Sequence, residues 1–268
     1  MKNNLIPIPI IGVPVVNGVH WVDRLIKSID YPVDNLLIIN NNGKGEIDSQ
    51  LDSLKKIENK FIKKLHIIHF PSNLGVASSW NLIIKLYLMK PYWVICSHDV
   101  AFTPGLLEEI AIATLDKEVA MIHPHKGQFN LGSYDLFVIT EKGVRDIGLF
   151  DENLYPAYAE DSDFIMRLNN IQPKMIKGLK NIHLHGDEIA KADDEHYKKN
   201  GMQTKKENEG LAMLLNQSNE INGEYLAKKW GDGWRMVQPH WNPFCNVEYP
   251  QSYITWDLDF VRSKYLGF

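Results

Sequence analysis

Short apolar segments alternate with amphipathic ones over roughly the first 100 residues of this 268-residue chain. The apolar segments are residues 8–16, 36–39, 65–70 and 93–96, and the segments between them are 21–29, 47–61 and 76–87. The amphipathic segments repeat their apolar side chains at helical spacing, as Trp21, Leu25 and Ile29 do. Alternating strands and helices predict an α/β fold with a mainly parallel sheet and helices on both faces.

The composition of the chain changes in its second half. Residues 119–122 and 136–139 are further strand-like segments, whereas residues 187–209 are densely charged and nearly free of large apolar side chains. A stretch of that kind is typical of a solvated helix or loop. The last forty or so residues are rich in tryptophan. We therefore expect a core over residues 1–186, followed by an appendage over 187–268 that begins with a lid-like stretch.

Charge and composition exclude several classes of protein. The formal net charge of −4 argues against a broad basic surface, so nucleic acid is not an expected partner. No apolar run approaches the roughly 20 residues that a transmembrane helix needs. Prolines interrupt the apolar N-terminus, which therefore does not resemble a signal peptide. With only two cysteines and no disulfide framework, we expect a soluble, cytoplasmic protein.

Four polar clusters follow the four apolar segments of the first half. They are residues 14–17, 40–43, 73–75 and 97–99. The carboxyl ends of parallel strands meet at one edge of a sheet, and open α/β sheets bind their ligands at that edge. Each cluster alone is an ordinary loop, but the four together predict a ligand site.

Six segments of the chain resemble glycosyltransferase family 2 and its GT-A relatives, in the family's order. They are PVVNGVHWVDRLIKSI, LLIINNNG, NLGVASSWN, VICSHDVAFTPGLL, GLFDENLYPAYAEDSDFIMRL and IHLHG, and they lie within about residues 8–186. The acidic cluster with its trailing arginine and leucine is the most specific of them. The resemblance implies a GT-A-like fold and inverting transfer of a sugar from a nucleoside-diphosphate donor to a glycan, lipid-linked or protein acceptor.

The resemblance also implies contacts to the donor from the first four loops. The implied donor-binding residues are Pro14, Asn17, Asn40, Asn41, Asn73, Gly75, Asn81, Ser97 and His98. Asn40, or Asn41 if the register is shifted by one, stands where relatives often use an aspartate that accepts a hydrogen bond from a pyrimidine. An asparagine carbonyl can accept the same bond without the charge. Trp80 stands where relatives often have an arginine.

A metal site is implied at the end of the fourth apolar segment. Asp99 stands at the second acidic position of the family's DXD motif, and a strand-end carboxylate suits Mn²⁺ or Mg²⁺. Ser97 replaces the first acidic residue, so the metal dependence is expected to be weaker or altered. In relatives a histidine near His183 or His185 completes the site, and either position fits here. A turn or capping role for Asp99, and simple packing for the histidines, are the alternatives.

The acidic cluster is implied to hold the catalytic base. A carboxylate can accept the proton of an acceptor hydroxyl, and the resemblance singles out Asp161, with Glu160 on the acceptor side. Capping of a helix by these residues is the alternative, because the helix dipole favours negative charge at its start. Asp163 and Arg167 are four residues apart and are expected to form a structural ion pair.

The tail and the altered motif leave rival interpretations open. Trp230 and Trp234 could stack on an acceptor sugar, or they could anchor the appendage to the core. Because Ser97 breaks the DXD motif, a catalytically silent GT-A module that binds carbohydrate or acts as a scaffold is a second hypothesis. A nucleotidyltransferase would need a basic, glycine-rich loop after the first strand, and residues 12–18 contain no lysine or arginine.

Overall fold

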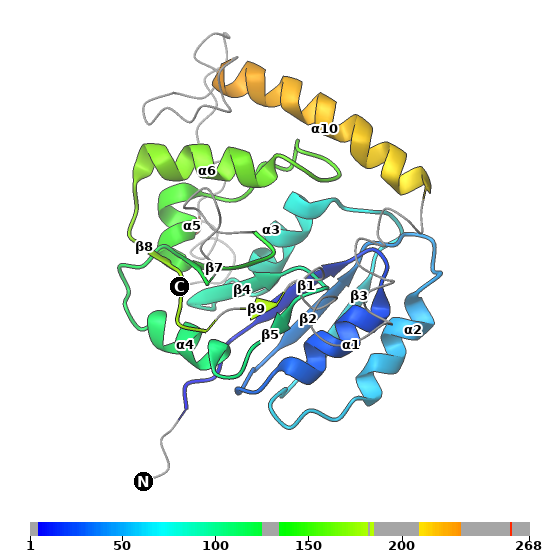
Figure 1. Cartoon of the computed structure of the whole chain (residues 1–268), viewed down its shortest axis with the longest axis vertical. Coiled ribbons are helices and arrows are strands. Elements are labelled where there is room, and N and C mark those ends of the chain that lie inside the picture. The colour runs from blue at the N-terminus through cyan, green and yellow to red at the C-terminus, as the bar shows by residue number, and fades with distance from the viewer. Residues whose placement is uncertain (1–4, 125–133, 182, 185–208, 232–257, 259–268) are drawn as a thin grey trace.

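A computed structural model of the chain describes residues 5–124, 134–181, 183–184, 209–231 and 258. A seven-stranded sheet with the order β3-β2-β1-β4-β7-β6-β8 forms its centre (Figure 1). The strands are β1 (Ile11–Val15), β2 (Leu36–Asn40), β3 (Leu65–His69), β4 (Tyr92–Cys96), β6 (Met121–His123), β7 (Leu136–Thr140) and β8 (Met175–Lys177). Only β7 runs antiparallel to its two neighbours in this sheet. The predicted α/β fold with a mainly parallel sheet is therefore confirmed.

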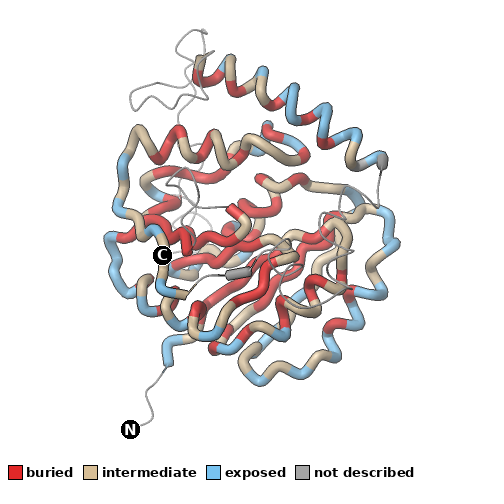
Figure 2. The backbone as a smooth tube through the Cα atoms, viewed as in Figure 1, coloured by how far each residue is buried: buried red, intermediate tan, exposed pale blue. Residues whose placement is uncertain are grey.

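Helices cover both faces of the sheet (Figure 1). On one face lie α1 (Val19–Ser28), α2 (Asp48–Ser53) and α4 (Leu106–Ala113), and on the other lie α3 (Val76–Leu86), α5 (Glu141–Ile147) and α6 (Glu160–Ile171). Successive side chains of a strand point to opposite faces, so Ile38 of β2 joins the first core and Ile39 the second. Strands β2 and β4 are consequently buried along their whole length, and β1 is buried except at Pro14 (Figure 2).

The helix predicted over residues 47–61 is shorter than expected. It consists of α2 and one 3₁₀ turn (Leu54–Lys56). Asn59 ends it, because its side chain donates to the carbonyls of Ile26 and Ile29 and accepts from the amide of Phe61. These side-chain bonds satisfy a turn in place of a continued helix.

A long helix, α10 (Glu209–Trp230), lies beyond α6 on the outer side of the second core (Figure 1). Leu226 and Trp230 of α10 pack against Leu154 and Met166, so the helix is joined to the core by its own apolar contacts. Two short strands, β5 (Ala101–Phe102) and β9 (His183–Leu184), form a separate antiparallel pair. Among the described residues, no helix is long and apolar enough to cross a membrane.

Candidate active site

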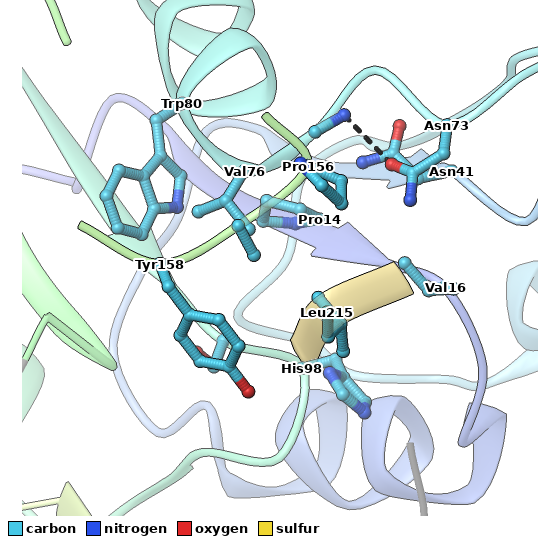
Figure 3. Close-up of a pocket in the computed structure, with 13 residues that line it drawn as sticks. Pro14, Val16, Asn41, Asn73, Val76, Trp80, His98, Pro156, Tyr158 and Leu215 are labelled. Atoms are coloured by element: carbon cyan, nitrogen blue, oxygen red, sulfur yellow. Dashed lines mark hydrogen bonds between the residues drawn. The ribbon is translucent and has the colours of Figure 1, made fainter. Parts of the chain in front are cut away.

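A cavity of about 200 Å³ opens at the carboxyl ends of β1, β2 and β4 (Figure 3). Six of the predicted donor-binding residues line it: Pro14, Asn41, Asn73, Gly75, Ser97 and His98. The lining residues that the sequence did not single out for binding are Val16, Val76, Trp80, Pro156, Ala157, Tyr158 and Leu215. The strand-end clusters therefore do converge, as the sequence predicts for an open α/β sheet.

Two parts of this lining differ in origin, and we name them by their residues. The strand-end wall consists of Pro14, Val16, Asn41, Ser97 and His98, which belong to β1 or directly follow β1, β2 and β4. The loop wall consists of Pro156, Ala157 and Tyr158, which precede α6, together with Leu215 of α10. The N-terminal half of α3 lies between the two walls and contributes Val76 and Trp80.

Trp80 makes the cavity largely apolar at the α3 side. Its ring is nearly buried and packs edge-on against Phe137 and Phe150, with centroids 5.1 and 4.8 Å away. An arginine here would bring a charge to the cavity, whereas tryptophan brings a flat apolar surface. None of the described lining residues is a lysine or an arginine.

Asn41 presents a hydrogen-bond acceptor at the cavity. Its Nδ2 donates to Ser79 Oγ over 2.7 Å, and Ser79 Oγ donates in turn to the carbonyl of Gly75 over 2.6 Å. This orientation leaves Asn41 Oδ1 buried with no hydrogen-bond partner among the described residues. A buried unpaired carbonyl is costly, so this atom is suited to accept a bond from a ligand.

Asn40 has a different environment from its neighbour. Its Nδ2 lies 2.6 Å from Asp48 Oδ1 and 2.8 Å from His69 Nδ1, and its Oδ1 accepts the amide of Asn42. These contacts tie the Asn40 side chain to the start of α2 and the end of β3, and Asn40 does not line the cavity. Of the two positions that the sequence left open, the structure therefore places Asn41 at the cavity.

The start of α3 is held against the loop wall. Asn73 Oδ1 accepts the amide of Gly75 over 2.8 Å (Figure 3), and the amide of Val76 donates to the carbonyl of Pro156 over 2.8 Å. Gly75 has φ +82°, and a Cβ on it would lie 2.9 Å from Tyr155 Cδ2. The left-handed backbone and the close approach both require glycine at this position.

Asn17 and Asn81 lie outside the cavity lining. Asn81 is buried in α3, where its amide nitrogen donates to the Phe150 carbonyl and to Glu152 Oε1, and its oxygen accepts the Phe150 amide. It therefore joins α3 to the segment before α6. Asn17 Oδ1 is buried without a partner among the described residues.

The segment from Ser97 to Asp99 follows β4. The amide of Ser97 donates to the carbonyl of Asp135 over 2.7 Å, and His98 Nε2 would lie 3.0 Å from a Cβ placed on Gly18. Burial, and then the charges of Asp135 and Asp99, raise the pKa of the Cys96 thiol. Asp99 and Asp135 therefore both lie near Cys96 at the end of β4, and the sequence did not single out Asp135 because it lies far along the chain from that strand.

The predicted metal ligands are only partly described. His183 is known here through its backbone in β9, which pairs with Phe102, and His185 lies outside the described residues. Within the described part of the chain, no group of three histidine, cysteine, aspartate or glutamate side chains is arranged to hold a metal ion.

The acidic cluster forms the start of α6, as the sequence predicts. Asp161 Oδ1 accepts the amide of Ser162 over 2.7 Å, a local contact that leaves the carboxylate partly exposed. The Asp161 charge contributes, after burial, to raising the pKa of the Tyr134 hydroxyl, which places the two groups near each other. Burial, and then the Asp161 charge, raise the pKa of Glu160 to about 8. Near neutral pH, Glu160 is therefore largely protonated.

Asp163 and Arg167 form the predicted ion pair, with Arg167 Nη2 3.0 Å from Asp163 Oδ2 and both side chains buried. The pair extends into α10, because Trp230 Nε1 and Lys229 Nζ each lie 2.8 Å from Asp163 Oδ1. Lys229 also contacts Asp151 over 2.7 Å. Trp230 is therefore placed as an anchor of α10 and does not line the cavity, while Trp234 lies outside the described residues.

Comparison with known proteins supports the same family that the sequence motifs resemble. Residues 10–141 match the family described as Glycosyl transferase family 2. A galactofuranosyl glycosyltransferase from Leishmania donovani is 26% identical over 227 residues, covering 60% of this chain and 52% of that protein. The chain thus spans about half the length of the curated relative that it matches.

Solved structures share the fold at low sequence identity. A mannosyltransferase from Pyrobaculum calidifontis, in complex with GDP-Man and Mn²⁺, is 14% identical with a TM-score of 0.51, covering 66% of this chain and 58% of its own. GalNAc-T7 with UDP, GalNAc and Mn²⁺ is 11% identical with a TM-score of 0.53, covering 69% and 44%. TarS residues 1–349 from S. aureus, in complex with UDP, is 14% identical with a TM-score of 0.50, covering 72% and 69%.

Proposed function

This chain carries a glycosyltransferase family 2 domain with a GT-A fold, and from that premise we propose that it transfers a sugar, with inversion, from a nucleoside-diphosphate sugar to a hydroxyl acceptor. The observation that carries the proposal is the cavity at the strand ends, where six of the residues implied to bind the donor meet. Its apolar surface and the unpaired Asn41 oxygen suit a flat base with one N–H donor. Uracil and thymine both present such a donor.

Asp161 is the proposed general base. It accepts the proton of the acceptor hydroxyl as that oxygen bonds to the anomeric carbon, and the bond from that carbon to the diphosphate oxygen breaks with its electron pair leaving on the diphosphate. The neighbouring Glu160 is kept largely protonated at neutral pH by burial, so it does not compete for the proton. The position of Asp161 at the start of α6, three residues after Tyr158 of the loop wall, supports this role.

The leaving diphosphate needs compensation for its charge, because the described cavity lining has no lysine or arginine. Asp99 fits the anchoring of a divalent cation, since Mg²⁺ is commonly held by one or two carboxylates together with substrate phosphates. A bound Mn²⁺ or Mg²⁺ would supply Lewis-acid stabilisation of the departing diphosphate. His98, and His183 or His185, are proposed to assist at the diphosphate.

The proposed partners are the donor and a glycan, lipid-linked or protein acceptor. Glu160 is proposed to face the acceptor, and Trp234 remains a candidate for stacking on its sugar. A cytoplasmic location belongs to the same proposal.

Thermal unfolding with a panel of nucleoside diphosphates and nucleotide sugars, with and without Mn²⁺ or Mg²⁺, tests the proposal. A ligand at 100 times its dissociation constant stabilises the fold by about 2.7 kcal/mol, which raises the unfolding temperature by about 5–10 °C for a chain of this size. We expect a metal-dependent shift with a uridine or thymidine nucleotide. No shift with any nucleotide would contradict the proposal and favour a silent GT-A module, which the replacement of an acidic residue by Ser97 makes the second candidate.

A further inference from the structure

We propose that Asn222 of α10 is a positioning residue, whose side-chain amide holds the backbone before α6 in the conformation that sets Tyr158 and Asp161 for the reaction. The role rests on the function proposed above, but it involves a residue outside the span that matches the family. Asn222 belongs to neither the cavity lining nor the acidic cluster.

The backbone that Asn222 contacts is in a conformation that these residues rarely adopt. Tyr158 has φ +72° and Ala159 has φ +75°, so two consecutive non-glycine residues lie in the left-handed region. Each costs free energy relative to an ordinary conformation and persists only where its surroundings hold it. Tyr158 is itself part of the loop wall, and Asp161 follows two residues after Ala159.

Every carbonyl of this short segment accepts a hydrogen bond. The Pro156 carbonyl accepts from the Val76 amide and the Ala159 carbonyl accepts from the Asp163 amide, so both ends are tied to helix starts. The two middle carbonyls, of Ala157 and Tyr158, are bound by the single Nδ2 of Asn222, at 3.0 and 2.9 Å. The middle of the strained segment is therefore held mainly from α10.

Asn222 is well placed to resist movement of the segment. Its side chain is buried, and an amide nitrogen has two hydrogens, one for each carbonyl. Ser218, one turn earlier, adds a longer contact of 3.3 Å to the Ala157 carbonyl. Further along α10, Lys229 and Trp230 are bound to the buried Asp163 of α6, which fixes the helix that carries Asn222.

The alternative is a joining role, in which Asn222 only attaches α10 to the core, as other residues of α10 do. Tyr225 provides the comparison, since its hydroxyl donates to Asp151 Oδ2 over 2.8 Å, and Asp151 lies outside residues 156–160. A positioning role predicts that the two residues differ in their effect on catalysis. A joining role predicts that they differ only in their effect on stability.

The test compares Asn222→Asp with Tyr225→Phe in the full chain. Aspartate matches asparagine in shape but has no N–H to donate, and Tyr225→Phe removes the bonds of the Tyr225 hydroxyl with Asp151 and Asn153. We expect faster amide hydrogen exchange in residues 156–160 and a fall in kcat for nucleoside-diphosphate release of roughly tenfold to 100-fold in Asn222→Asp. Tyr225→Phe should retain the wild-type kcat and the wild-type exchange of this segment.

Asn222→Ser is the second variant. The short serine side chain cannot reach both carbonyls, and because serine is neutral, this variant avoids the buried carboxylate that could destabilise Asn222→Asp. Wild-type kcat in a folded Asn222→Asp or Asn222→Ser variant would overturn the positioning role, as would an equal loss in Tyr225→Phe. A wild-type protein that binds no nucleotide and turns over no donor would instead overturn the proposed function, and the hydrogen-exchange comparison would still report whether Asn222 holds the segment.

Discussion

The strand-end wall and the loop wall enclose the same cavity but are built in different ways. Residues of the strand-end wall belong to or follow buried strands, and their positions are fixed by the register of β1 with β2 and β4. Apart from Leu215, the loop wall lies in a segment with two left-handed residues, which is held by side chains of α10. One wall is set by apolar packing of the sheet, and the other by polar contacts between parts of the chain that are distant in sequence.

The difference separates recognition from chemistry in the proposed mechanism. The strand-end wall carries the unpaired acceptor Asn41 Oδ1, and the described residues of that wall bear no carboxylate. The loop wall leads directly into the acidic start of α6. A rigid apolar frame suits recognition of the nucleobase of the donor. The general base Asp161, in contrast, depends on a strained segment that a few hydrogen bonds hold in place.

The largest effect on the loop-wall side is expected from Asp163→Asn. The change leaves Arg167 without its buried charge partner and weakens the contact of Lys229, so we expect a loss of about 3–5 kcal/mol in the free energy of unfolding. Urea unfolding measures it. Lys27→Met, which breaks the exposed pair of Lys27 with Asp23, is the control and should cost no more than about 1 kcal/mol. Equal losses in the two variants would show that the network does not hold this side together.

Glu160→Gln is expected to change how stability depends on pH. In the folded chain the pKa of Glu160 is about 8, above its ordinary value of 4.5, mainly because of burial and then because of Asp161. The unfolded chain therefore loses this proton first, and stability falls as pH rises from about 4.5 to about 8. Glutamine has no proton to lose, so the variant should gain on the order of 5 kcal/mol over the wild type well above pH 8 and little near pH 5. Parallel pH profiles of the two urea midpoints would contradict the assignment.

Substitutions in the strand-end wall should mainly change the affinity for the nucleotide. Asn41→Leu removes the unpaired acceptor, and we expect it to weaken binding of uridine diphosphate about tenfold, measured by calorimetry. Asn40→Leu is the matched control, because Asn40 is engaged with Asp48 and His69. It should lower the unfolding temperature and leave the dissociation constant unchanged. The reverse pattern would place the base beside Asn40.

The sequence predicted the strand-end side of the site better than the loop-wall side. The strand ends and the convergence of Pro14, Asn73 and Ser97 follow from alternating apolar and polar segments. The choice between Asn40 and Asn41 did not follow, because a shift of one residue along a strand moves a side chain to the opposite face. Only the contacts of Asn40 with Asp48 and His69 decide it.

The loop-wall side depends on contacts that local sequence does not encode. The spacing of Asp163 and Arg167 predicted their ion pair, which the structure confirms. Nothing in the pattern near Tyr158 indicates its left-handed backbone, and nothing near Leu215 indicates that it lines the cavity. Trp230 is a further example. Its aromatic side chain suited either stacking on an acceptor sugar or anchoring the appendage, and only its bond to Asp163 shows that it anchors α10.

The most direct test of the central claim is the release of nucleoside diphosphate from a nucleotide sugar by the wild type and by Asp161→Asn. Asparagine keeps the shape of aspartate but cannot accept the acceptor's proton as a base. We predict that kcat falls on the order of 10²–10⁴-fold, while the dissociation constant for the nucleoside diphosphate and the unfolding temperature stay at their wild-type values. An Asp161→Asn variant that releases nucleoside diphosphate at the wild-type rate would contradict the account.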